Sequence, residues 1–208
     1  MPKLPAPPSL AALRASQPEL RVLPVGFELW RVHFAGGHRR TTWDTFRHYG
    51  PVTSSRFDPH LPPPRIQDRG VLYAADQIPT CLAEVFQVTR VIDRVLREPW
   101  LTGFRLARPV MVLDCTGAWP TRAGASMNLN SGPRNRARAW ARAIYQAMPE
   151  VEGLYYASSM HSNQPCVTLF ERALDAVPSK PTFHRPLAHP ALTDRLRTAA
   201  AQLGYRIV

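Results

Sequence analysis

Cysteine is scarce in this 208-residue sequence, which has only Cys81, Cys115 and Cys166, all far apart. No Cys-x-x-Cys pair occurs, so a zinc site built on thiolates is not expected, and we expect no bound metal. An odd number of cysteines in mainly apolar surroundings indicates reduced, buried thiols and therefore a cytoplasmic protein.

Long apolar runs are also missing. No stretch approaches the ~18 apolar residues that a membrane span needs, so we expect no membrane partner. The proline-rich residues 1–8 lack the apolar centre of a signal peptide. A Gly-x-Gly-x-x-Gly pattern is absent as well, so we expect no Rossmann-type site and no permanently bound cofactor.

Lysine is nearly absent, although the formal net charge is +11. Apart from Lys3 and Lys180, the surplus comes from arginine. Such a surplus points to nucleic acid, a polyanionic metabolite or an acidic protein as partner, or merely reflects genome composition. Because the arginines are scattered and form no basic run, direct binding of nucleic acid is the weaker interpretation.

The chain has the length of one domain with a substantial core, and 45% hydrophobic with 20% charged residues is typical of a globular protein. Residues 1–26 are predicted to be an extended, mobile arm (1–8) followed by a short helix, Leu10–Ala15, capped by Ser9. Residues 27–208 are predicted to form a single mixed α+β domain.

Alternation predicts a strand over Phe27–Phe34, with Arg31 and His33 on one face. Residues 35–70 lack periodicity and are expected to be long loops with a possible strand at Ser55–Asp58, and residues 116–132 are expected to be loop. The other expected strands cover 71–73, 100–106, 110–114, 153–158, 166–170 and 205–208, and the other expected helices begin near Thr80, Pro133 and Pro190.

Four side chains near element ends are candidates for a site. Glu84 lies among apolar residues one turn into the helix after the strand that carries Tyr73, so burial can tune its pKa and its role. Arg31 lies on the first strand of the domain, and Ser158 ends a late apolar strand. For each residue alone, an ordinary structural or solvated role explains the pattern equally well.

Together, these residues resemble the RES domain, which is named for its Arg, Glu and Ser. The resemblance covers roughly residues 27–172 and depends on the order of three local patterns. These are an aromatic-Arg pair (Trp30-Arg31); an Arg-Phe-Asp-Pro segment (Arg56–Pro59) followed by Leu-Tyr-Ala (Leu72–Ala74) and Ala83-Glu84; and Gly-x-x-Tyr-x-Ser (Gly153–Ser158) followed by an apolar strand ending in Leu-Phe (Val167–Phe170).

The resemblance implies more than the residues themselves show. RES proteins are toxins of bacterial toxin–antitoxin pairs, similar in fold to ADP-ribosyltransferases of the diphtheria-toxin type. They consume NAD+ by cleaving its nicotinamide–ribose bond, and their usual antitoxin is a helix-turn-helix protein that blocks the active site. By this resemblance we expect NAD+ as a consumed substrate and an antitoxin as partner.

The chemistry assigns roles within that expectation. Cleavage builds positive charge on the ribose, which the Glu84 carboxylate can stabilise. Tyr73 can stack on nicotinamide, and Arg31 can bind pyrophosphate through its planar fork, with Arg56 as a second phosphate contact. Ser158 can bind the dinucleotide or orient Arg31 or Glu84, whereas Tyr156 and His33 are expected to be structural.

Several alternatives remain open. The acceptor can be water, phosphate or a protein side chain, which would make the enzyme a glycohydrolase, a phosphorylase or an ADP-ribosyltransferase. A different class is a module without catalysis that binds nucleic acid or an acidic antitoxin. It would use the arginines on the polar face of the 133–148 helix, opposite an apolar stripe expected to be core. Those arginines are Arg134, Arg136, Arg138 and Arg142.

Overall fold

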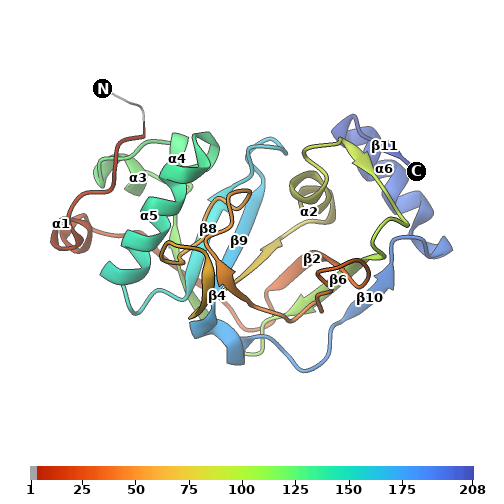
Figure 1. Ribbon diagram of the computed structural model, residues 1–208, viewed down its shortest axis with the longest axis horizontal. Coiled ribbons are helices and arrows are strands. Elements are labelled where there is room, and N and C mark those ends of the chain that lie inside the picture. Colours follow the sequence, from red (N-terminus) through yellow and green to blue (C-terminus); the bar gives the residue numbers. More distant parts are fainter. Residues whose placement is uncertain (1–3) are drawn as a thin grey trace.

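A mixed β-sheet forms the centre of the computed structural model, which describes residues 4–208 (Figure 1). Its strands are β1 (Leu20–Leu23), β2 (Glu28–Phe34), β3 (Arg47–Gly50), β4 (Arg65–Ala75), β6 (Pro99–Arg105), β7 (Val110–Asp114), β8 (Gly153–Ala157), β9 (Pro165–Phe170) and β10 (Phe183–Pro186). Within the described range the order is β1-β7-β8-β9-β4-β2-β6-β10, with β3 paired to β4. The chain is therefore a mixed α+β domain, as predicted.

Helices cover this sheet at both ends of the molecule. In Figure 1, α1 (Leu10–Ala15), α3 (Trp119–Arg122), α4 (Asn128–Ser131) and α5 (Arg134–Ala147) gather at one end, and α2 (Ile78–Val85) and α6 (Thr193–Leu203) lie at the other. Two 3-10 helices cover Glu171–Ala176 and Pro190–Leu192. A separate parallel pair joins β5 (Val91–Ile92) to β11 (Arg206–Ile207).

The strands β2 and β4 meet at one residue pair, Trp30 opposite Ala75. Beyond that pair β2 continues along β6 and β4 continues along β9. The sheet therefore opens between Arg31 on β2 and Tyr73 on β4, and α2 follows directly from the end of β4. This opening positions the site described below.

Alternation along the strands produces two cores. Leu72 is fully buried in one, which also holds Leu29 and Phe104, while its neighbour Tyr73 packs against the other. The second core is closed by the apolar stripe of α5, whose residues are buried as predicted: Ala137, Trp140, Ala141, Ile144 and Met148. No helix among residues 4–208 is long and apolar enough to cross a membrane.

Local signals predicted several elements well. The α1 helix has the expected bounds, and the Ser9 side chain accepts a hydrogen bond from the amide of Ala12. The strand β7 covers Val110–Asp114, and α5 begins directly after Pro133. Gly204 ends α6 with φ of 66°, a left-handed conformation that glycine adopts without strain.

The structure corrects the prediction for the first residues of the chain. Within the described part of the arm, residues 4–8 are not a free segment, because Leu4 is buried and the Pro5 carbonyl accepts a hydrogen bond from the Trp140 indole. Residues 1–3 lie outside the described range. The α2 helix begins at Ile78 rather than near Thr80, with Gln77 at the N-cap.

The structure also corrects two predicted loops. Residues 35–70 contain β3 and the first half of β4, while Ser55–Asp58 is not a strand. Only the two glycines among these strand residues, Gly50 and Gly70, are buried, so the strands lack the alternation that marks a half-buried strand. Residues 116–132 contain the short helices α3 and α4.

Candidate active site

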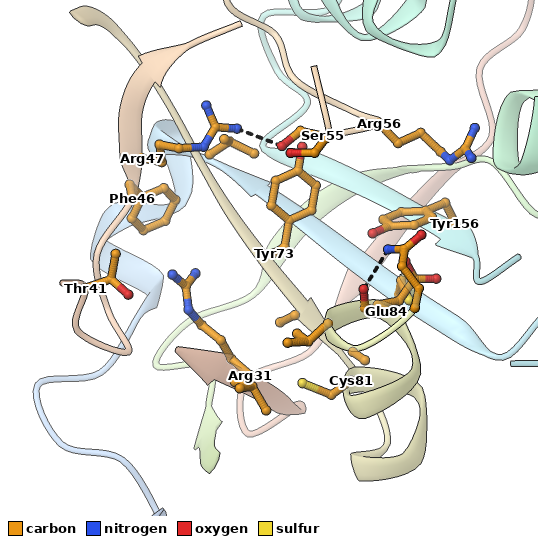
Figure 2. Close-up of a pocket in the computed structure, with 18 of the residues that line it drawn as sticks. Arg31, Thr41, Phe46, Arg47, Ser55, Arg56, Tyr73, Cys81, Glu84 and Tyr156 are labelled. Carbon is orange, nitrogen blue, oxygen red and sulfur yellow. Dashed lines mark hydrogen bonds between the residues drawn. The ribbon is translucent and has the colours of Figure 1, made fainter. Parts of the chain in front are cut away.

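A cavity of about 590 Å³ occupies the opening between β2 and β4 (Figure 2). Its volume suits a small-molecule ligand. Four predicted site residues line it, namely Arg31, Arg56, Tyr73 and Glu84, whereas Ser158 lies behind Glu84 and is not part of the wall. Glu84 is the one carboxylate among the described lining residues, and it shares the cavity with four arginines: Arg31, Arg47, Arg56 and Arg134.

Glu84 is half-buried at the edge of the cavity because its helix is anchored in the core. Leu82 and Ala83 are fully buried, which leaves the Glu84 side chain facing the cavity. The Ser158 hydroxyl donates a hydrogen bond of 2.6 Å to Glu84 Oε1. It also accepts the amide N–H groups of Met160 and His161, both at 3.1 Å. The amides occupy its lone pairs, so its proton is directed at the carboxylate.

His161 fixes the loop that carries Ser158, and nothing in the sequence pattern had indicated it. Its Nδ1 lies 2.9 Å from the Thr80 hydroxyl, and its Nε2 lies 3.0 Å from the Gln202 amide nitrogen. Thr80 lies on α2, one turn before Glu84, and Gln202 lies on α6. The ring therefore ties the loop to both helices, and burial lowers its pKa.

Arg31 enters the cavity from β2 without a carboxylate partner. Its Nη2 lies 3.4 Å from the Thr45 carbonyl, a weak hydrogen bond, and its Nε is buried with no hydrogen-bond partner among the described residues. Burial lowers the pKa of Arg31 to about 10, so the side chain stays charged at neutral pH. A partly buried guanidinium that forms no ion pair is suited to bind an anionic ligand.

Two tyrosines contribute aromatic surface to the cavity. Tyr73 stands between Arg31 and Glu84 in Figure 2, and burial raises its pKa. Its hydroxyl lies near Ser55 but has no hydrogen-bond partner within the part of the chain that the structure describes. Tyr156 packs edge-on against Phe57, with 4.6 Å between ring centroids, as expected of a structural residue, yet it also lines the cavity.

Arg56 reaches the cavity from the segment between β3 and β4. Its Nη1 donates to the Gly132 carbonyl at 2.6 Å, and burial, followed by the charge of Arg134, lowers its pKa. Arg134 donates to the Gln87 side chain at 2.6 Å, and Arg138 donates to the Thr53 carbonyl at 2.7 Å. Two arginines of the α5 polar face are thus engaged within the domain, which weakens the nucleic-acid interpretation.

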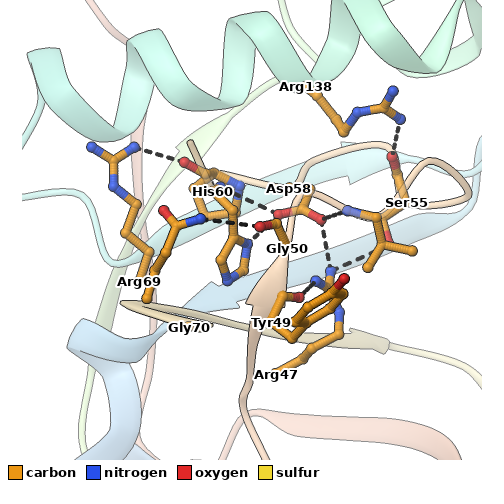
Figure 3. A network of polar contacts seen from close by, with 12 residues as sticks. Arg47, Tyr49, Gly50, Ser55, Asp58, His60, Arg69, Gly70 and Arg138 are labelled. Carbon is orange, nitrogen blue, oxygen red and sulfur yellow. Dashed lines mark hydrogen bonds and ion pairs between the residues drawn. The ribbon is translucent and has the colours of Figure 1, made fainter. Parts of the chain in front are cut away.

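Arg47 is a cavity residue that we did not predict. It lies on β3, and its Nη2 forms an ion pair of 3.0 Å with Asp58, whose side chain is fully buried. Asp58 and His60 form the centre of a polar network in the 47–69 segment (Figure 3). The sequence feature that could have pointed to Arg47 is the Arg-Phe-Asp-Pro pattern, because it contains its ion-pair partner Asp58.

His33 lies outside the cavity. Its Nδ1 lies 3.0 Å from the Thr41 carbonyl, and its ring stacks on His184 with 5.4 Å between centroids. These contacts agree with a structural role, although its buried Nε2 has no partner among residues 4–208. In the same range, no group of three or more His, Cys, Asp or Glu side chains could hold a metal ion.

The family model of the RES domain matches residues 28–190. The chain belongs to the RES domain family. The resemblance seen in the sequence is thereby confirmed, and the match continues past residue 172 to residue 190. The family match includes every candidate site residue: Arg31, Arg56, Tyr73, Glu84 and Ser158.

A solved structure has a similar fold. A chain in the crystal structure of the M. tuberculosis MbcT–MbcA toxin–antitoxin complex is similar with a TM-score of 0.59. The similarity covers 91% of this chain and 96% of that chain at 14% sequence identity, so it shows a shared fold. No curated protein matches the sequence.

Proposed function

We propose that this RES domain protein is a toxin that depletes NAD+ by cleaving the bond between nicotinamide and ribose. The supporting observation is a single cavity that contains one carboxylate, oriented by Ser158, together with an unpaired guanidinium, Arg31, and an aromatic ring, Tyr73. These are the groups that recognition and cleavage of a dinucleotide with a pyridinium leaving group require.

Glu84 has the central role in this reaction. As the C1′–N bond breaks, its electron pair leaves with nicotinamide and positive charge develops on the ribose. The Glu84 carboxylate stabilises that charge, and the Ser158 hydroxyl holds it in one orientation from behind. Neutral nicotinamide needs no proton to leave, so no general acid is required.

The remaining cavity residues bind the substrate. Arg31 and Arg56 contact the diphosphate through charge-assisted hydrogen bonds. Tyr73 offers a ring face for stacking on nicotinamide. Water adds to C1′ and loses its proton to solvent, which gives ADP-ribose. Phosphate in place of water gives the ADP-ribose phosphate ester. A protein side chain as acceptor makes the enzyme an ADP-ribosyltransferase.

The proposal extends to the type of fold and to the protein partner. We propose that the opening between β2 and β4 is the NAD+ cleft of a fold related to ADP-ribosyltransferases of the diphtheria-toxin type. We also propose that a helix-turn-helix antitoxin covers this cleft and silences the toxin. The similar solved chain comes from a toxin–antitoxin complex, which supports an antitoxin as partner.

The test is incubation of the purified chain with NAD+, with nicotinamide and ADP-ribose quantified by liquid chromatography. In one separate arm, added phosphate detects phosphorolysis. In another, isotopically labelled NAD+ detects transfer of ADP-ribose to protein. Glu84→Gln keeps the shape and removes the charge, so turnover should fall at least ~100-fold. Glu150→Gln, on the exposed Glu150, is the matched control. No nicotinamide from well-folded wild-type protein, or full turnover by Glu84→Gln, would contradict the proposal.

A further inference from the structure

The β3 strand, braced by the segment that follows it, places a second guanidinium beside Arg31. Arg47 and Arg31 both line the cavity, and Figure 2 shows them on the same side of Tyr73, across from Glu84. Burial is the main cause that lowers the pKa of Arg31; the nearby Cys81 and Asp44 raise it, and the charge of Arg47 lowers it by the smallest amount. Two cations held together next to a cavity indicate that the ligand supplies negative charge there.

Arg47 is held by a fully buried carboxylate. Asp58 accepts from Arg47 Nη2 at 3.0 Å and from the Val52 amide at 2.7 Å. The Arg47 side chain is 29% exposed, whereas that of Asp58 is 0% exposed. A buried charge is tolerated only when it is paired, so Asp58 strongly restrains Arg47.

His60 completes the support for Asp58 (Figure 3). The imidazole Nδ1 and the backbone amide of His60 both contact Asp58 Oδ1, and the ring is fully buried. Burial alone would raise the pKa of Asp58, but the His60, Val52 and Arg47 contacts lower it to about 2. Gly50 allows this packing, because a Cβ there would lie 2.6 Å from the His60 ring.

Both Arg47 and Arg31 keep guanidinium N–H groups that are free to bind a ligand. A guanidinium has five N–H groups, and Arg47 uses three of them, on Tyr49, Ser55 and Asp58. Its Nε–H and one Nη1–H have no partner among the described residues. Arg31 uses one donor, on the Thr45 carbonyl. The two guanidinium groups can therefore donate several hydrogen bonds to one anion in the cavity.

We propose that Arg47 and Arg31 form a two-arginine clamp for the diphosphate of the substrate, and that Asp58 and His60 are positioning residues that hold Arg47 in place. The inference rests on the proposed function and deepens it. It adds to Arg31 and Arg56 a phosphate contact that no sequence pattern assigned, and it gives the segment between β3 and β4 a role in substrate recognition.

Binding of ADP-ribose tests the clamp separately from bond cleavage, because ADP-ribose keeps the diphosphate and lacks nicotinamide. Isothermal titration with Arg47→Ala and Arg31→Ala should show Kd raised at least ~10-fold, the loss expected for charge-assisted hydrogen bonds. Arg122→Ala is the matched control, because Arg122 is also ion-paired, with Glu19 at 2.7 Å, and does not line the cavity. Adenosine, which has no phosphate, should bind these proteins equally.

A double-mutant cycle then tests the positioning role. Asp58→Asn should raise the Kd for ADP-ribose and the KM for NAD+ several-fold with kcat little changed. Asp58→Asn added to Arg47→Ala should cause no further loss, because Asp58 acts through Arg47. Additive losses, or unchanged ADP-ribose affinity in Arg47→Ala, would overturn the clamp. Absence of nicotinamide release by the wild type, with ADP-ribose binding that depends on Arg47, would instead overturn the proposed cleavage and leave the clamp standing.

Discussion

Replacing Ser158 by alanine should separate the orientation of Glu84 from the integrity of the fold. The change removes the 2.6 Å hydrogen bond to Glu84 and leaves the buried amide of His161 without its acceptor. One unsatisfied buried donor costs about 1–3 kcal/mol, and a hydrogen bond to a charged group contributes about 1.5–3 kcal/mol. Glu84 is partly exposed to the cavity and water can replace the lost donor, so we expect a total loss of about 2–4 kcal/mol.

Two assays measure the two effects. At this chain length, about 1 kcal/mol shifts the melting temperature by about 2–4 °C, so Ser158→Ala should melt roughly 4–16 °C lower. The turnover number for NAD+ should fall about 10- to 100-fold with KM nearly unchanged, because Glu84 loses its orientation while the binding arginines stay in place.

The matched control is Ser162→Ala, in the same loop, where the side chain is exposed. It should leave both quantities unchanged. If Ser158→Ala melts lower but turns over NAD+ at the wild-type rate, Ser158 serves only the fold. If it melts like the wild type, the hydrogen bonds assigned to its hydroxyl contribute nothing.

Two further outcomes follow from single side chains. Tyr73→Phe should retain activity within a few-fold, because the Tyr73 hydroxyl has no partner in the described chain. Tyr73→Ala should raise the KM for NAD+ at least ~10-fold, because the ring that stacks on nicotinamide is lost. Equal KM values in the two variants would contradict stacking. Burial lowers the pKa of His33 to about 4, so between about pH 6.5 and 4 the unfolded chain binds a proton there that the folded protein does not. Stability should therefore fall as the pH drops through this window, by up to about 3 kcal/mol, and urea unfolding at pH 7 and 4.5 should show a smaller drop in His33→Asn.

The elements that the sequence predicted are those in which one face is buried against a regular neighbour. Helix α5 could be placed because Ala137, Trp140 and Ile144 repeat at helical spacing and all three are fully buried. The cap at Ser9 and the end at Gly204 depend on local backbone chemistry. Such signals lie within a few residues and need no knowledge of the rest of the fold.

The elements that the sequence did not predict are stabilised by contacts with residues outside those elements. The first half of β4 is largely solvent-accessible, but the Gln67 side chain donates to the Gly50 carbonyl, 17 residues away in the sequence, and to the Leu61 carbonyl, and it accepts the Leu61 amide. The β1 and β10 strands lie at the two edges of the sheet and pair on one side. A strand held by pairing and side-chain contacts leaves little periodic trace in its own residues.

The same distinction applies to the candidate site. Arg31, Arg56, Tyr73, Glu84 and Ser158 could be proposed because each lies in a short pattern of the RES domain, and the structure brings them to one cavity or directly behind it. His161 and Arg47 could not, because their roles depend on contacts with Gln202 and Asp58, which no local pattern connects to them.

The opening between β2 and β4 explains why the site and the least predictable region coincide. Two strands that pair at one position cannot close a cavity by themselves, so the segment between them must supply the missing wall. That segment adds Trp43, Phe46 and Phe57 to the two cores. It is also ordered by a buried charge, Asp58, which is paired with Arg47 and His60. The charges that order the loop also place a guanidinium at the substrate. Substitutions that loosen the 47–69 segment should therefore weaken substrate binding before they unfold the domain.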